Sequence, residues 1–515
     1  EVQQHAGALS VYVQICTDSL QPSVRVCCGM GCVRRVKVNT MFAGAKVTGG
    51  GCGLGKIRGQ GNVRHWTCRY PDRERGRILA CLERGYEIIQ GMHTDPDFYA
   101  IIPAGGAGSR LWPLSRAAKP KFLLDLTSDG RTLIQSTWDR LLGVCRSSHI
   151  AVSTGVRYAD AVLSQLPGLA ENNIFAEPVG RDSMAAIALA AAVLAKRHGR
   201  SIIVGSFAAD HVITDNGRFS SAVSQAIAAA RAGFITTIGI TPNSPSTAFG
   251  YIRGGEPLPD IGRPGDPEDP EDPENSEDTE RAQAASASAG IVAGSLQVFR
   301  VESFVEKPDH DTAKAYAASG KYRWNAGIFI MRAGTLLDAL EGLHPHMYSQ
   351  IMEIAGAWDT PQQESLMLGV WPEIEKTAFD YAIAEPVAQK GGVAVVPGDF
   401  GWKDIGDFAS LSSFAPVADS HGNRILLAPA DNGNMANSNG MADGSGPAAG
   451  PRLVSAGSSG NLVVSAQAPS GKVVALVGLE DTVLVDTPDA LLVMPKSKAQ
   501  DVRAVSGILE NKPEN

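Results

Sequence analysis

The chain has 515 residues, of which 44% are hydrophobic and 19% are charged, and its formal net charge is -8 at pH 7. This length allows two or three domains with a sizeable core, and the composition is typical of a globular protein. The negative charge argues against nucleic acid as the main partner. We find no apolar run long enough for a membrane span and no signal peptide, so we expect no membrane partner.

Residues 1–95 are rich in Gly, Arg and Cys and show no sustained helical or strand period, so we expect a disordered or non-native extension, with Met92 as a candidate natural start. The segment GGCGLGKI at 50–57 is close to a P-loop, but Ile57 stands where a magnesium-binding Ser or Thr belongs. After residue 95 the chain contains only Cys145, a usage typical of a reducing compartment, and we expect a cytoplasmic protein. Four of the earlier cysteines lack the paired spacing of a zinc ribbon: Cys27, Cys28, Cys32 and Cys52.

From residue 98 onward, strand and helix patterns alternate. Apolar segments predict strands at 98–104, 149–155, 201–213 and 234–241, and segments with helical patterning predict helices at 132–145, 180–199 and 218–233. Such alternation favours a sheet with helices on both faces. We therefore predict a Rossmann-like, doubly wound α/β domain with a mixed sheet at 96–415.

Two segments interrupt this order. Residues 256–290 repeat Pro and acidic residues, which cannot bury a core, and predict a disordered insertion. Residues 427–460 are rich in Gly, Asn, Ser and Ala and predict a second, flexible insertion. Short apolar segments after residue 460 predict a small β domain at 416–515, with a left-handed β-helix as one candidate and oligomerisation as one role.

The stretch IIPAGGAGSRLWPLSRAAKPKFLLDL at 101–126 carries the strongest chemical signal. Its glycines let the backbone approach phosphates, and its Arg and Lys residues supply fixed positive charge that suits a triphosphate. A dinucleotide-binding fingerprint is the nearest rival, but it expects glycines that open a helix, whereas Pro113 and further cations follow here. A tight turn without any ligand is the simplest alternative.

The form PAGGAGSRLWPLSRAAKPKFLLDL resembles the loop GGxGxRLxPLS followed by PK of the sugar-phosphate nucleotidyltransferases. It looks most like the members that act on GTP and mannose 1-phosphate, and ordered motifs extend the resemblance over about 98–415. The resemblance implies a GT-A-like nucleotidyltransferase fold. It also implies attack of a mannose 1-phosphate oxygen on the α-phosphorus of GTP, with Mg²⁺ as cofactor and GDP-mannose and pyrophosphate as products.

The same resemblance suggests roles for individual residues of the nucleotide site. Arg110 would bind the departing pyrophosphate and Lys121 the α-phosphate region, while Asp210 in AADHVI and Asp404 in GWKDIGDF would hold Mg²⁺. Glu177 in EPVGRDSMAAIA could accept hydrogen bonds from guanine N1 and its exocyclic amine, although a solvent-facing helix start is the simpler interpretation. The full set for the nucleotide is Ala104, Gly105, Gly106, Gly108, Ser109, Arg110, Glu177, Arg181 and Asp182.

The sugar-phosphate site is implied by four further motifs, FGYIRGGE, FVEKP, WNAGIF and FDYAIAE. They supply Gly250, Tyr251, Glu306, Lys307, Asn325 and Asp380. The sequence departs from the family pattern twice. The acidic insertion follows where the family continues a short hairpin, and Phe249 stands where many relatives have a polar residue.

Three alternatives stay open at this point. A transferase for glucose or N-acetylglucosamine 1-phosphate shares nearly every motif, although Glu177 and WNAGIF favour guanine and mannose. A nicotinamide-dependent oxidoreductase is opposed by the cluster of cations. A catalytically silent regulatory homologue would be expected to lack Lys121 or one aspartate, and both aspartates are present.

Overall fold

The structure, a computed structural model, describes residues 9–16, 23–28, 31–37, 63–70, 95–106, 108–258, 261, 296–428, 451–466 and 472–510. The chain divides into two compact units, Glu1–Met92 and His93–Asn515. We describe each unit by itself.

The first unit contains four strands, β1 (Leu9–Cys16), β2 (Ser23–Cys28), β3 (Gly31–Lys37) and β4 (Val63–Tyr70). They form an antiparallel sheet in the order β3-β2-β1-β4. The expectation that residues 1–95 lack regular structure is therefore wrong for these strands. Each is short, and segments such as LSVYVQIC carry the β-branched and aromatic residues that favour pairing. That the unit is a non-native extension stays a prediction, and the segment at 50–57 lies outside the described residues.

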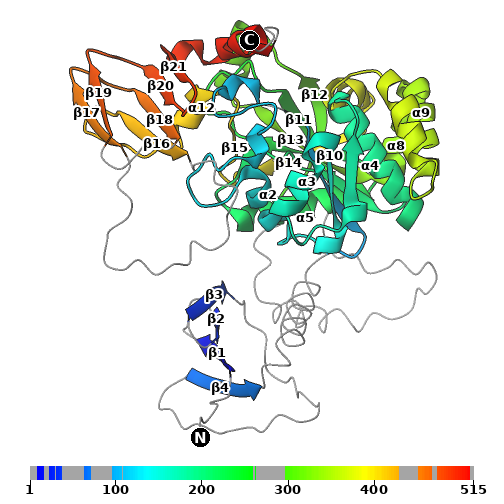
Figure 1. Ribbon diagram of the computed structural model, residues 1–515. Coiled ribbons are helices and arrows are strands. Elements are labelled where there is room, and N and C mark those ends of the chain that lie inside the picture. The colour runs from blue at the N-terminus through cyan, green and yellow to red at the C-terminus, as the bar shows by residue number, and fades with distance from the viewer. Residues whose placement is uncertain are drawn as a thin grey trace, which may run out of the picture. The chain divides into compact units, whose positions relative to one another are not determined.

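The second unit contains a sheet of nine strands: β5 (Phe98–Ala104), β6 (Ile150–Gly155), β7 (Ile174–Glu177), β8 (Ile203–Ser206), β10 (Ile235–Ile240), β11 (Tyr251–Pro257), β12 (Phe299–Val305), β13 (Tyr322–Arg332) and β14 (Val393–Gly398). Their order is β10-β14-β12-β11-β13-β8-β5-β6-β7. Strands β10 to β14 are labelled in Figure 1. Strands β8, β5, β6 and β7 pair in parallel, whereas β11 pairs antiparallel with both β12 and β13. The predicted mixed α/β sheet is confirmed.

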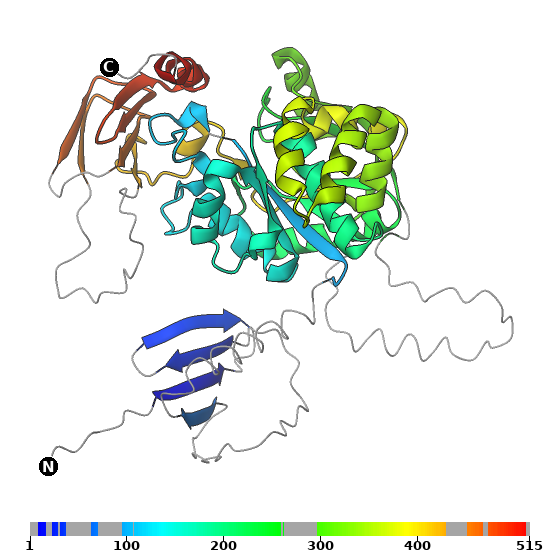
Figure 2. The ribbon, with the colours of Figure 1, turned by 45° about the vertical axis from the view of Figure 1, so that its right-hand side comes forward.

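Helices pack on both faces of this sheet. One face carries α2 (Leu133–Leu141), α3 (Ala159–Gln165) and α5 (Asn216–Arg231), and the other carries α4 (Asp182–His198), α8 (Ala333–Leu343), α9 (Pro345–Ala357) and α11 (Glu385–Gln389). Figure 2 shows β5, in blue, between the cyan and the yellow-green helices. Alternate residues of β5 enter the two cores: Phe98 and Ala100 join one, and Tyr99 and Ile101 join the other. Such burial on both faces explains why FYAIIPA is apolar throughout.

Strands β11 and β12, which precede and follow the acidic insertion in the sequence, form a hairpin. Tyr251 pairs with Val305 and Pro257 pairs with Phe299, so the chain has both the insertion and a hairpin. Its first strand includes residues 256 and 257, which were assigned to the insertion. A long connection at a hairpin tip is tolerated because the entropic cost of loop closure grows slowly with length.

The C-terminal part consists of short strands: β16 (Arg424–Ala428), β17 (Arg452–Ala456), β18 (Leu462–Ala466), β19 (Val473–Val477), β20 (Thr482–Asp486) and β21 (Leu491–Pro495). Strands β16, β18 and β20 pair in parallel, as do β17 and β19, which is the stacking expected of a β-helix. The predicted flexible insertion at 427–460 is wrong for β17, where Leu453 packs on a small apolar cluster.

An apolar cluster joins the C-terminal strands to the glycine-rich loop. Leu111 and Leu114 of the loop share it with Val464 and Val483, with Phe408 of α12 (Phe408–Ser412), and with Val502 at the start of α13 (Val502–Glu510). This burial anchors one side of the loop.

Candidate functional site

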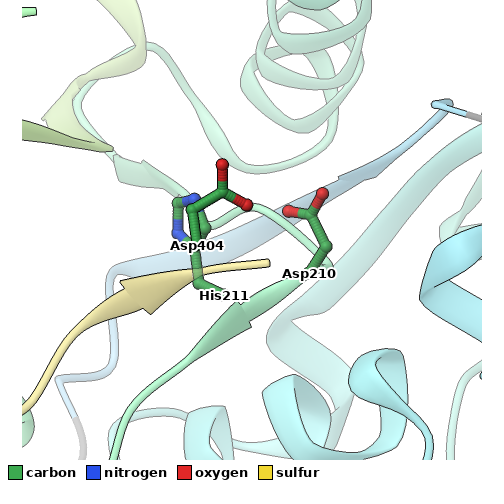
Figure 3. Close-up of side chains that lie close together, drawn as sticks. All are labelled: Asp210, His211 and Asp404. Carbon is green, nitrogen blue, oxygen red and sulfur yellow. The ribbon is translucent and has the colours of Figure 1, made fainter. Parts of the chain in front are cut away.

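Three potential metal ligands meet where two short strands pair. β9 (His211–Val212) and β15 (Lys403–Asp404) run antiparallel, with His211 directly opposite Asp404, and Asp210 immediately precedes β9. One ligand atom from each of these three side chains lies within 4.8 Å of the other two (Figure 3). The two aspartates that the sequence analysis proposed as metal ligands are therefore brought together. His211, their neighbour, was not singled out.

Lys121 lies beside both aspartates. It belongs to the short helix η3 (Lys121–Leu123), its Nζ is 2.6 Å from Asp210 Oδ2 and 3.5 Å from Asp404 Oδ1, and it donates to the carbonyl of Ile405 at 2.8 Å. Burial alone would lower the pKa of Lys121, but the two carboxylates outweigh it and raise the pKa above its ordinary value. Burial would likewise raise the pKa of Asp210, yet Lys121 and then His211 hold it below the usual range. Lys121 is thus a buried ammonium in contact with two carboxylates.

The glycine-rich loop packs directly on Lys121. Gly108 has a φ of 71°, and a Cβ there would lie 2.6 Å from the Cβ of Lys121, so only glycine fits. Ser115 Oγ donates to the Gly108 carbonyl at 2.5 Å and fixes the turn. Gly105 and Gly106 face open space, because a Cβ at either would meet no atom within 4 Å. The exposed Arg110 follows in η2 (Ser109–Leu111). This arrangement leaves backbone and guanidinium accessible to an anion.

Glu177 ends β7 and is 5% exposed, so the alternative of a solvent-facing helix start is wrong. Ser153 Oγ, from the neighbouring strand β6, donates to Glu177 Oε1 at 2.9 Å. Burial raises the pKa of Glu177 to about 7, although the Ser153 hydroxyl and the backbone of Arg181 oppose the rise. Arg181 and Asp182 lie where α4 begins, and Asp182 Oδ1 accepts from the backbone of Ser183 at 2.8 Å.

A second polar cluster surrounds Asn325 on β13. Asn325 Nδ2 donates to Asp380 Oδ1 at 2.7 Å, and Asn325 Oδ1 accepts from Thr237 Oγ1 at 2.8 Å and from the backbone N–H of Gly327 at 3.1 Å. Burial raises the pKa of Asp380 to about 7, and the Glu306 carboxylate adds to this rise. The three hydrogen bonds hold the amide side chain of Asn325 in one orientation.

Glu306 and Lys307 complete this second cluster. Lys307 Nζ lies 2.5 Å from Glu306 Oε1, and the backbone N–H of Glu306 donates to Glu385 Oε1 at 3.0 Å. Glu306 Oε2 is buried and has no hydrogen-bond partner among the described residues. A Cβ at Gly250 would lie 2.3 Å from this oxygen. An unpaired buried carboxylate oxygen favours a ligand with a donor group, such as a hydroxyl.

Tyr251 does not belong to this cluster, contrary to the expectation from its motif. Its side chain is fully buried, and its hydroxyl accepts from the backbone N–H of Ser246 at 3.0 Å. Strand alternation explains the difference, because Tyr251 enters the core next to Gly250. Thr237, which supports the cluster, was missed because it lies in none of these motifs. Glu385 also supports it and lies at the end of the FDYAIAE motif, but the sequence analysis assigned it no role.

The two clusters are neighbours. Gly327 bonds to Asn325, and a Cβ at Gly327 would lie 3.7 Å from His211 Cε1, so a single residue separates the polar cluster from the acid cluster. The donors of the acid cluster, two carboxylates and an imidazole, suit a divalent cation. The side chains of Asp210 and Asp404 remain 31% and 29% exposed, which leaves that cation room to reach a ligand.

Comparisons with known proteins give two family models that match this chain. The family model named Nucleotidyl transferase matches residues 99–262 and 281–419, and a model named MannoseP isomerase/GMP-like beta-helix domain matches residues 452–509. The second match supports the β-helix prediction for the C-terminal strands. Among the described residues, no helix combines the length and apolar character needed to cross a membrane.

Relatives with assigned activities are similar over most of the chain. Mannose-1-phosphate guanylyltransferase of Escherichia coli K12 is 35% identical over 413 residues, which cover 79% of this chain and 72% of the relative. Alginate biosynthesis protein AlgA of Pseudomonas aeruginosa is 32% identical over 417 residues, which cover 79% of this chain and 70% of that protein. A solved Thermus thermophilus structure, described as a mannose-1-phosphate geranyltransferase, is 26% identical with a TM-score of 0.59 and covers 80% of this chain and 99% of that one.

Proposed function

Because the chain belongs to the nucleotidyl transferase family, we propose that it transfers GMP from GTP to mannose 1-phosphate, forming GDP-mannose and releasing pyrophosphate. The observation that carries the proposal is the contact of Lys121 with both Asp210 and Asp404, beneath a loop that presents Gly105, Gly106 and Arg110. This contact supports the proposal, because fixed positive charge lies next to two carboxylates that can hold a cation. The names of the similar enzymes supply the substrates.

The chain's own residues act by positioning and by balancing charge. A sugar phosphate is ionised at neutral pH, so its oxygen can attack the α-phosphorus of GTP without a protein nucleophile or base. The bond from the α-phosphorus to the bridging oxygen breaks, and pyrophosphate leaves with the electron pair. In our proposal, Arg110 stabilises the charge that grows on the pyrophosphate, and the Lys121 ammonium stabilises the α-phosphate.

Members of this family normally use a divalent metal ion. We assign Mg²⁺ to this role, with Asp210 and Asp404 as its carboxylate ligands, because hard cations prefer carboxylate oxygen. When bound, such an ion supplies charge that neutralises phosphate oxygens.

In this proposal, Glu177 selects the base, and the cluster around Asn325 selects the sugar phosphate. The ionised Glu177 carboxylate can accept from N1 and the exocyclic amine of guanine, an edge that uracil and thymine do not present. The Glu306 oxygen without a partner and the fixed Asn325 amide offer hydrogen bonds to sugar hydroxyls, and Lys307 offers a charge for the sugar phosphate. We further propose a cytoplasmic location and self-association through the C-terminal β domain.

A crossed substrate assay tests the function. Pyrophosphate release is measured with GTP, ATP, UTP and dTTP, each combined with mannose, glucose or N-acetylglucosamine 1-phosphate. We expect the highest kcat/KM for GTP with mannose 1-phosphate. A preference for another sugar phosphate would favour the second candidate, a transferase for glucose or N-acetylglucosamine, which shares the same acid cluster.

A further inference from the structure

His211 stands out because neither the proposed chemistry nor the apolar core explains its position. It lies opposite Asp404 in the β9–β15 pair, so the two side chains emerge side by side from neighbouring strands (Figure 3). In an antiparallel pair, directly opposed residues project to the same face. The register therefore holds an imidazole next to a carboxylate that we assign to the metal.

The ring of His211 is otherwise free to coordinate. Its nitrogens make no hydrogen bond with any residue of the described ranges, its ring packs at a steep angle against the ring of Trp402, and its Cε1 atom lies near Gly327. Arg140 Nη2 donates to the backbone carbonyl of His211 at 3.3 Å, which restrains the strand but not the ring. A partly enclosed imidazole without a partner is unusual for a purely structural histidine.

The distances suit one shared ion. The ligand atoms of Asp210, His211 and Asp404 lie within 4.8 Å of one another. Ligands at about 2.0–2.2 Å from an ion can be up to about 4.4 Å apart, so a shift of a few tenths of an ångström would bring all three into contact with it.

We propose that His211 is a third protein ligand of the metal ion, alongside Asp210 and Asp404, and that the site consequently binds Mn²⁺ or Co²⁺ more tightly than Mg²⁺. The inference rests on the proposed function for the presence of a metal and adds the identity of one ligand. Imidazole nitrogen prefers first-row transition metals, whereas Mg²⁺ prefers oxygen and retains its waters. An imidazole ligand should widen the difference in affinity beyond that of a site with two carboxylates alone.

The test is pulsed electron paramagnetic resonance of Mn²⁺ bound to tag-free protein that has first been stripped with a chelator. A nitrogen bound directly to Mn²⁺ modulates the electron spin echo in a way that oxygen ligands do not. We expect this modulation in the native chain, with and without GTP, and its loss in His211→Asn. The control His310→Asn removes an imidazole that is 70% exposed on α7 (His310–Ser319) and should leave the signal unchanged.

Affinities provide the second measurement. Free Mn²⁺ counted by the same method should show that His211→Asn weakens Mn²⁺ binding by about 10-fold or more, whereas Mg²⁺ binding, measured by competition, changes far less. Bound Mn²⁺ without nitrogen modulation in the native chain would overturn the proposal, and that measurement needs no variant to fold. Such a result would leave the proposed function standing, because the crossed substrate assay decides that separately. If the protein failed to bind Mn²⁺ even with GTP, the assignment of His211 and of the two aspartates as metal ligands would be overturned.

Discussion

The ammonium of Lys121 lies 2.6 Å from the carboxylate of Asp210, which ties the segment after the glycine-rich loop to the acid cluster. The two residues come from different strand–loop units, and Gly108 is packed against the Lys121 side chain. The loop and the acid cluster are thus joined by close packing and an ion pair. Such contacts matter here because the proposed catalysis depends on position and charge alone.

Lys121→Met should remove the positive charge while keeping much of the side-chain volume. We expect kcat to fall by about 10²-fold or more, since a charge that stabilises the transition state is lost. The two carboxylates also lose their partner, so the melting temperature should drop. Steady-state kinetics and thermal unfolding measure both effects. The exposed Lys321→Met is the matched control, and a Lys121→Met enzyme with native kcat would contradict the assignment.

Glu177 should make GTP binding sensitive to pH near neutrality. Burial raises the pKa of Glu177 to about 7, so the free protein holds a proton there below that pH and an ionised carboxylate above it. Only the ionised form can accept both hydrogen bonds from guanine. We therefore expect KM for GTP to rise as the pH falls through about 7.

In Glu177→Gln this pH dependence should disappear, and KM for GTP should approach that for ATP. Parallel pH profiles of kcat/KM for the two proteins provide the measurement. An unchanged profile in the variant would exclude Glu177 as the group that titrates.

Gly250→Ala should weaken binding of the sugar phosphate and leave binding of the nucleotide unchanged. The new Cβ would lie 2.3 Å from Glu306 Oε2 and 3.3 Å from the Cβ of Asn325, so it has to displace the carboxylate. We expect KM for mannose 1-phosphate to rise by about 10-fold or more, with KM for GTP nearly unchanged. Gly342→Ala on α8, where a Cβ meets no atom within 4 Å, is the control. Equal effects on both substrates would contradict the division into two subsites.

Arg140→Met should separate stability from activity. Arg140 is buried on α2, lies over the ring of Phe219, and forms no salt bridge with a carboxylate among the described residues. Burial lowers the pKa of its guanidinium to about 10. Because a buried charge is costly, its replacement by an apolar chain should change the free energy of unfolding little.

Activity should nevertheless fall, because the His211 carbonyl loses its donor and the acid cluster its restraint. We expect a lower kcat at unchanged KM for mannose 1-phosphate, with partial recovery in Arg140→Lys. A variant that loses stability in proportion to activity would show that Arg140 is only structural.

The sequence predicted elements whose signals are local. FYAIIPA predicted the limits of β5, and the apolar face of 132–145 predicted α2 to within a few residues. The family motifs brought forward Asp210, Asp404 and Lys121, which the structure places together. Their roles remain predictions, since binding is not observed.

What the sequence could not predict depends on register between distant strands. His211 faces Asp404 because β9 and β15 pair, and each of these strands has only two residues, too short for any periodicity. Tyr251 was misplaced because the motif does not say on which side of the strand each residue lies. Thr237 supports Asn325 from a strand with no recognisable motif. Glu385 supports Glu306 from the end of FDYAIAE, where the motif gave a role only to Asp380. The sequence indicated His211 as a site residue only weakly, through its position next to Asp210 in the AADHVI motif.

The central claim is that bond formation takes place at the α-phosphorus of GTP. The most direct measurement supplies mannose 1-phosphate with GTP labelled with radioactive phosphorus at either the α or the γ position and separates the products by chromatography. The account predicts that the α label appears in the sugar nucleotide and the γ label in pyrophosphate. Transfer of the γ label to the sugar, or no labelled sugar product at all, would contradict it.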